Sequence, residues 1–158
     1  MPDTNSSTSP IDRCLERWHE FLRSSDPGLL DDLLDDDCVF LSPIVFRPQE
    51  GKEVTKLYLT AAGSTLGGGG DGGGSGGGRS EGEWDGRFRY VRKISEGHDA
   101  VLEFETTIAG KYVNGVDLIT CNDDARIVAF KVMIRPLQAV NAVHEQMKAM
   151  LARMTANN

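Results

Sequence analysis

Apolar residues recur at spacings of three and four in two long stretches, one near each end of the chain. In the first stretch, which begins at Pro10, the apolar positions are Ile11, Cys14, Leu15, Trp18, Phe21 and Leu22. This spacing predicts a helix with one apolar face, and proline is favoured in a first helical turn. Residues 137–154 are predicted to form a second amphipathic helix, with apolar positions at Leu137, Val140, Val143, Met147 and Met150.

Shorter elements are predicted after the first helix. Paired leucines indicate a short helix over 29–34, and the acidic residues 35–37 are interpreted as its solvated end. A cation site is the less favoured interpretation of this acidic run, because no second acidic cluster follows at metal-ligand spacing. A short strand is expected over 38–41. Gly51 then opens a third helix, whose apolar stripe is Val54, Leu57, Tyr58, Ala61 and Ala62.

From residue 87 onward apolar and polar residues alternate, which is the period of a half-buried strand. Four consecutive strands are predicted over 87–94, 101–108, 113–119 and 127–134. The residues expected on their apolar faces are Phe88, Tyr90, Ile94, Leu102, Phe104, Ile108, Val128, Phe130, Val132 and Ile134. Helices followed by an antiparallel run of strands predict an α+β domain. We expect a curved, mostly antiparallel sheet with the N-terminal helices on its concave face and a cone-shaped cavity between them.

The central strand, Val113–Ile119, contains one ionisable residue, Asp117. An unpaired carboxylate is costly to bury, so Asp117 is either a functional pocket group or an aspartate that faces solvent or is satisfied in a turn. Both faces of this strand have apolar residues, so alternation alone does not decide between the two. The walls of a pocket here would be Phe88, Phe104, Phe130, Val132 and Trp18.

Burial in such a pocket would raise the pKa of Asp117, because desolvation disfavours the charged carboxylate. No lysine or arginine is expected on the inward faces of the neighbouring strands. A neutral Asp117 would donate a hydrogen bond to a ligand carbonyl, with the indole N–H of Trp18 as a second donor.

A glycine-rich insert, GGGGDGGGSGGG, occupies residues 67–78. We interpret it as a flexible connector, with a binding lid or an engineered insertion as alternatives. It is not a phosphate-binding loop, because the Lys and Ser/Thr of that motif are missing. The predicted organisation is a disordered tail over 1–9, one domain over 10–136 that contains the insert, and a C-terminal helix and tail over 137–158.

Composition narrows the possible partners. The net charge of −7 argues against nucleic acid as a partner, and no apolar run approaches the length of a membrane span. Three scattered cysteines favour reduced thiols. The polar N-terminus lacks the apolar core of a secretory signal, so we expect a cytoplasmic protein. No motif indicates a metal or a cofactor.

Several segments together resemble the NTF2-like superfamily, in particular its SnoaL-like and ketosteroid-isomerase-like branches. The matching segments are 36–43, the helix start at Gly51, Val116-Asp117-Leu118 and the strand over 126–135. The resemblance implies a cone-shaped fold with a small-molecule pocket. It covers nearly the whole chain except the N-terminal tail, the insert and the last helix.

The resemblance also implies roles for single residues. Ketosteroid isomerases use a tyrosine on the first helix, an aspartate base before a proline after the first strand, and a protonated aspartate on a late strand. These positions fall on Trp18, Ser42 and Asp117. Serine is far too weak an acid to replace a carboxylate base. Arg135, which an epoxide hydrolase of this superfamily would need, is out of phase with the inward residues of its strand and is predicted to point away.

Three functions follow as alternatives. The first is a pocket protein that binds a hydrophobic, oxygenated small molecule, with Asp117 as polar anchor and Ser42 and Tyr58 as further contacts. The second is an isomerase, cyclase or hydrolase that acts on a small carbonyl or epoxide compound. The third is a non-catalytic dimeric accessory module. A homodimer is expected through the outer sheet face, whose apolar residues are Val91, Val101, Val116, Leu118, Ala129 and Met133.

Overall fold

The computed structural model describes residues 8–66 and 84–157. The tail up to residue 7 and the glycine-rich insert lie outside these ranges, so the predictions made for them stay predictions. Within the described ranges the elements are α1 (Pro10–Ser24), α2 (Gly28–Leu33), β1 (Leu34–Leu41), β2 (Gln49–Glu50), α3 (Lys52–Leu66), β3 (Arg89–Glu96), β4 (Asp99–Ile108), β5 (Lys111–Cys121), β6 (Ile127–Arg135) and α4 (Leu137–Ala156).

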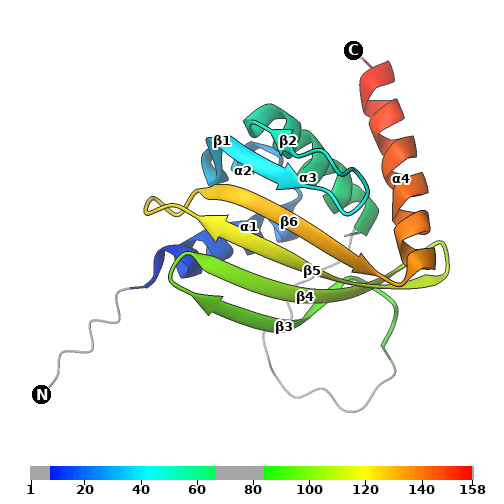
Figure 1. The fold of residues 1–158 in the computed structure, drawn as a ribbon, viewed down its shortest axis with the longest axis horizontal. Helices are drawn as coiled ribbons and strands as arrows, with labels where there is room; N and C mark the ends of the chain where they lie inside the picture. The colour runs from blue at the N-terminus through cyan, green and yellow to red at the C-terminus, as the bar shows by residue number, and fades with distance from the viewer. Residues whose placement is uncertain (1–7, 67–83, 158) are drawn as a thin grey trace, which may run out of the picture.

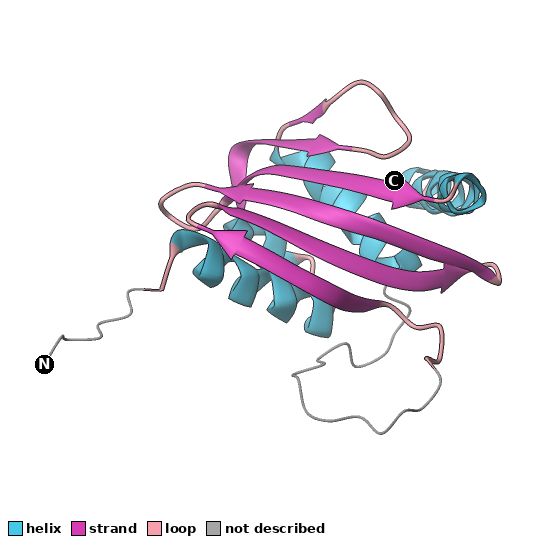
Figure 2. Ribbon diagram, turned by 60° about the horizontal axis from the view of Figure 1, so that its bottom comes forward, coloured by secondary structure: helices cyan, strands magenta, loops and turns pink. Residues whose placement is uncertain are grey.

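The six strands form one sheet in the order β2-β1-β6-β5-β4-β3. The β1–β6 pair is parallel and the other neighbours are antiparallel. Helices α1 and α3 cover one face of the curved sheet, whereas the opposite face is uncovered (Figure 2). Helix α4 follows β6 and stands at the end of the sheet beside α3 (Figure 1). The predicted α+β architecture is therefore confirmed.

The acidic run 35–37 does not end a helix, which corrects the sequence interpretation. Leu34 already has extended backbone angles and pairs with Ile127, so β1 begins there and includes the three aspartates. Asp36 forms an ion pair with Lys52 at 2.9 Å, and Asp35 accepts a hydrogen bond from the side-chain amide of Asn122 at 3.2 Å. The run is thus held by neighbouring side chains at the start of a strand.

Two irregularities in strand pairing change which residues face the helices. The register shifts between Tyr90 and Arg92, so that Lys93 pairs with Leu102 and Ile94 pairs with Val101 on the outer face. Ile94 is consequently 60% exposed, and its predicted inward position is wrong. A second shift in the β5–β6 pairing makes Ile127, rather than the predicted Val128, the fully buried residue at the start of β6.

The apolar stripes of the later helices also differ from the predicted ones. The most buried side chains of α3 include Thr55 and Leu59, which the predicted stripe omitted. In α4 the buried residues are Ala139 and Val143, while Leu137 is 75% exposed. The difference arises because each helix meets the sheet only along part of its length, so the buried positions depend on its placement as well as its periodicity.

The core consists of two packed groups of side chains. The larger group joins α1 and α2 to the sheet, and it includes Cys14, Cys38 and Cys121, all buried as free thiols. The smaller group joins α4 to β4 and β5 through Phe104, Val113 and Val143, among others. No helix in the described part of the chain is long and apolar enough to cross a membrane.

Candidate functional site

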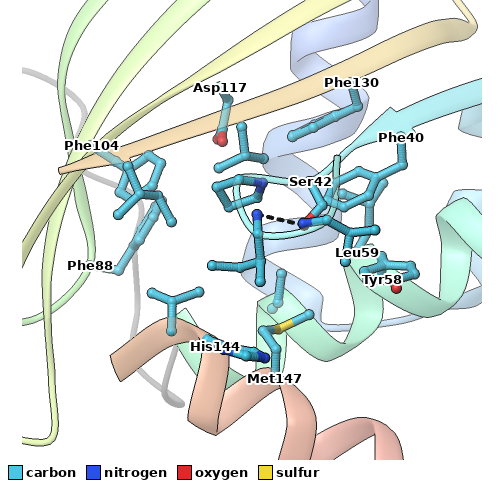
Figure 3. A pocket seen from close by; sticks show the side chains of 18 of the residues that line it. Phe40, Ser42, Tyr58, Leu59, Phe88, Phe104, Asp117, Phe130, His144 and Met147 are labelled. Atoms are coloured by element: carbon cyan, nitrogen blue, oxygen red, sulfur yellow. Dashed lines mark hydrogen bonds between the residues drawn. The ribbon is translucent and has the colours of Figure 1, made fainter. Parts of the chain in front are cut away.

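A cavity of about 320 Å³ lies between the concave face of the sheet and helices α1, α3 and α4. This volume is at the lower end of the range typical of small-molecule pockets. All the residues predicted from the sequence line it: Trp18, Ser42, Tyr58, Phe88, Phe104, Asp117, Phe130 and Val132. The close-up in Figure 3 shows aromatic and aliphatic side chains around the Asp117 carboxyl, which points inward.

The aromatic walls are fixed by contacts with one another. Phe88 stacks on Phe104 with ring centroids 5.3 Å apart, and the rings of Trp18 and Phe130 lie 4.9 Å apart. On the opposite side Tyr58 of α3 stacks on Phe40 at 5.1 Å. Ring pairs that support one another in this way hold the walls of the cavity in place.

The polar centre of the cavity is a chain of hydrogen bonds that ends at Asp117. The Trp18 indole Nε1–H donates to the Tyr90 hydroxyl at 3.0 Å, and the Tyr90 hydroxyl donates to Oδ2 of Asp117 at 2.7 Å. No other hydrogen bond reaches this carboxyl within the described part of the chain, so Oδ1 has no hydrogen-bond partner there. Trp18 is therefore not the second ligand donor that the sequence suggested, because Tyr90 already accepts its N–H.

Burial controls the ionisation of this centre. Asp117 is 6% exposed between its strand partners Leu102 and Val132, and burial raises its pKa to about 7, although the hydrogen bond from Tyr90 lowers it. Burial, and then the nearby Asp117 charge, also raise the pKa of Tyr90 well above its ordinary value. Asp117 therefore keeps its proton to a higher pH than an ordinary aspartate, and a neutral carboxyl can donate a hydrogen bond.

As predicted, no lysine or arginine lies on the inward face of β4 or β6, the two strands that flank Asp117. On the more distant β3, the register shift turns Lys93 toward the helices, although its side chain is exposed. Its charge contributes, after burial, to lowering the pKa of His19 on α1. Lys93 is not among the residues that line the cavity, and it does not offset the burial of Asp117.

Ser42 stabilises a backbone turn. Its Oγ accepts hydrogen bonds from the backbone N–H groups of Ile44 at 3.0 Å and Val45 at 3.2 Å, in the loop that follows β1 (Figure 3). A serine hydroxyl held by two donors and without a basic partner is not activated for proton abstraction. The position that the resemblance assigns to a carboxylate base is thus filled by a turn-forming residue.

We expect Ser42→Ala to lower the free energy of unfolding by about 1 kcal/mol, because two backbone amides lose their acceptor. Urea denaturation measures this loss, and calorimetric titration of a cavity ligand should show an affinity within about twofold of wild type. A large loss of affinity with little loss of stability would instead make Ser42 a ligand contact.

Three of the polar residues that line the cavity were not predicted as site residues from the sequence. Tyr90 was predicted on the inward face, but alternation gives no indication of its hydrogen bond to Asp117. His144 and Lys148 line the cavity from α4, one turn apart on the helix. His144 and Lys148 lie beside Val143 and Met147, which belong to the predicted apolar stripe of this helix. That position was the available signal, but an apolar stripe by itself predicts a packing surface and not a cavity wall.

Tyr90→Phe keeps the ring and removes the hydroxyl that donates to Asp117. We expect the pKa of Asp117 to rise further, because the hydrogen bond that favours the charged form is lost while burial remains. Carboxyl-carbon NMR titration of the wild type and the variant measures this change. An unchanged or lower pKa would show that the Tyr90 hydroxyl does not stabilise the carboxylate.

Arg135 lies away from the cavity, in agreement with its predicted phase on β6. Its guanidinium donates to Oδ1 of Asn114 at 3.4 Å, and it is not among the lining residues. Among the described residues that line the cavity there is therefore one buried carboxyl and no arginine.

No family model and no curated protein sequence matches the chain, but solved structures do. A steroid delta-isomerase from Pseudomonas aeruginosa is 29% identical, with a TM-score of 0.77 over 93% of this chain and 95% of the other. An uncharacterized protein with a cystatin-like fold from Silicibacter pomeroyi is also 29% identical, with a TM-score of 0.68 over 86% and 83%. An NTF2-like protein of unknown function from Mesorhizobium loti is 19% identical, with a TM-score of 0.61 over 86% and 98%.

Proposed function

We propose that the cavity binds an apolar small molecule that has a ketone or ester oxygen, since the chain shares the fold of NTF2-like proteins and is 29% identical to a steroid delta-isomerase. The observation that supports this most directly is the buried Asp117 carboxyl, which lines the cavity and whose Oδ2 accepts from Tyr90. In its neutral form this carboxyl donates to the ligand oxygen. The aromatic walls enclose the apolar remainder of the ligand.

A ketone and its matching hydrocarbon test this proposal. We expect butyrophenone to bind about three- to tenfold more tightly than butylbenzene, because one neutral hydrogen bond contributes about 0.5–1.5 kcal/mol. Isothermal titration calorimetry measures both affinities. Asp117→Leu should remove the preference for the ketone, while Asp117→Asn, which keeps an N–H donor, should retain part of it. Equal binding of the two compounds by the wild type would contradict the proposal.

Isomerisation is the second candidate, because the steroid delta-isomerase from Pseudomonas aeruginosa matches nearly the whole chain. Against it stands Ser42, which occupies the base position of the family and forms a turn. Among the described lining residues, His144 is then the candidate for a base, because histidine often serves as one, but the carboxylate at the family's base position is absent. We therefore expect no measurable conversion of a β,γ-unsaturated ketone to its conjugated isomer, followed by ultraviolet absorbance. Turnover that disappears in His144→Gln would favour the isomerase instead.

We also propose that two copies associate through the uncovered face of the sheet. This face presents apolar side chains of which Val91, Ile94 and Met133 are 44%, 60% and 50% exposed. Polar pairs such as Arg92–Glu103, 3.4 Å apart, lie beside them. Association would bury this apolar surface, and a twofold dimer is the commonest arrangement of such an interface.

Met133→Lys should shift this equilibrium toward the monomer, because it places a charge at the centre of the apolar face. The matched control is Phe46→Lys, a fully exposed apolar residue in the loop after β1. Light scattering at micromolar concentration should give twice the 17.2 kDa mass of one chain for wild type and control. A monomeric wild type would contradict the dimer proposal.

A further inference from the structure

The mouth of the cavity differs in charge from its interior. His144 and Lys148 are exposed on α4 and line the cavity together with Met147 between them. In Figure 3 His144 and Met147 lie on the α4 side, across the cavity from Asp117. An acidic group is thus buried in the sheet wall, and basic groups occupy the helix at the exposed edge.

Few ionisable residues line the cavity, so the charge at its mouth depends on two of them. Apart from two tyrosines, the ionisable residues that line the cavity in the described part of the chain are Asp117, His144 and Lys148. Lys148 takes part in none of the ion pairs found among the described residues. Glu145, the acidic neighbour on α4, is not a lining residue. The mouth is therefore locally basic in a chain whose net charge is −7.

We propose that the ligand is an amphipathic keto acid, with its carbonyl oxygen at Asp117 and its carboxylate at the cavity mouth beside Lys148 and His144. The inference rests on the proposed function, because the same carboxyl anchors the carbonyl end. The orientation follows from desolvation: a carboxylate loses its hydration if it enters the apolar interior, and at the mouth it stays in water. Lysine suits this position because its ammonium group is a flexible, hydrated point charge.

Four aromatic probes of matched size separate the two ends of the ligand. Benzoylpropionate has the ketone and the carboxylate, benzoylpropionamide has only the ketone, phenylbutyrate has only the carboxylate, and phenylbutyramide has neither. Calorimetric affinities for the full set give the contribution of each group separately. We expect each carboxylate to bind about threefold to fivefold more tightly than its amide, which is the range of an exposed ion pair.

Lys148→Gln should remove most of this preference for carboxylate over amide and leave the affinities for the amides unchanged. The matched control is Lys131→Gln, because Lys131 is an exposed lysine on β6 that does not line the cavity. His144→Gln should remove the remainder of the preference. Raising the salt concentration should weaken the preference in the wild type, because an exposed pair is screened.

The outcomes distinguish the two proposals. If the ketones bind more tightly than the compounds without a ketone but the carboxylates show no advantage, the keto-acid inference is wrong and the pocket function stands. If the carboxylate advantage persists in Lys148→Gln, the charge at the mouth does not recognise the ligand and the inference is also wrong. If neither group contributes, or no probe binds, both proposals fail together.

Discussion

Asp117→Asn should remove most of the decline in stability that the wild-type protein shows between about pH 4 and pH 8. The folded-state pKa of Asp117 is raised from 3.8 to about 7, so the folded protein holds this proton more tightly than the unfolded chain does. The stabilisation is fully present below the unfolded value and is lost as the pH rises through the folded one. Three pH units correspond to a loss on the order of 4 kcal/mol.

Urea denaturation at closely spaced pH values measures this effect, and the difference between wild type and variant isolates it. Burial lowers the pKa of His19, so His19 contributes the opposite trend near pH 6, but it does so equally in both proteins. Asp124→Asn, at an exposed aspartate in the β5–β6 turn, is the matched control and should follow the wild-type curve. Parallel curves for wild type and Asp117→Asn would show that the carboxyl is ionised in the folded state throughout this range.

The proposed binding of a carbonyl depends on where the fold places the Asp117 carboxyl. Asp117 is buried between apolar residues on adjacent strands, and Tyr90 fixes its orientation through Oδ2. Because the donor is part of the central strand, it requires no movement to meet a ligand oxygen. A group held in this way can bind a carbonyl without any base, which agrees with a serine at the position of the family base.

The inward aromatic residues could be predicted because the strands alternate with a period of two. Phe104 and Phe130 come from β4 and β6, Phe88 immediately precedes β3, and each of the three lines the cavity as expected. The same rule fails at Ile94, because a single irregularity after Tyr90 reverses the faces of the residues that follow. No residue in this stretch of β3 signals the shift, since neither glycine nor proline marks it.

The side-chain contacts of the site could not be predicted from the sequence, for a different reason. The hydrogen bond from Tyr90 to Asp117 joins residues on β3 and β5, which are not neighbouring strands. Leu102 of the intervening strand β4 is the register partner of Asp117, and strand alternation does not predict that Tyr90 reaches across β4. The position of Lys148 likewise depends on where α4 stands at the end of the sheet, which its own periodicity does not determine.

The second large effect is the loss of stability that we expect when Gly115 on β5 is replaced by alanine. A Cβ added there would lie 2.5 Å from Cζ of Phe104 and 2.6 Å from the backbone oxygen of Met133. Both contacts are far inside van der Waals distance, and the backbone oxygen belongs to a paired strand that cannot move freely. We expect Gly115→Ala to destabilise the protein by about 3 kcal/mol, which is typical of overpacking in a core.

Urea denaturation compares this variant with Gly63→Ala on α3, where the added Cβ meets, among the described residues, just the ring of Phe21, at 3.7 Å from Cζ and 4.0 Å from Cε1. That control should be stabilised by about 0.5–1 kcal/mol, because alanine favours a helix over glycine.

Adding Phe104→Leu to Gly115→Ala should relieve the clash with the ring but leave the clash with the Met133 oxygen. Compared with Phe104→Leu alone, the double variant should therefore remain less stable by more than 1 kcal/mol. A Gly115→Ala protein as stable as the wild type would show that β5 and β6 separate easily at this point, next to the strand positions that hold Asp117.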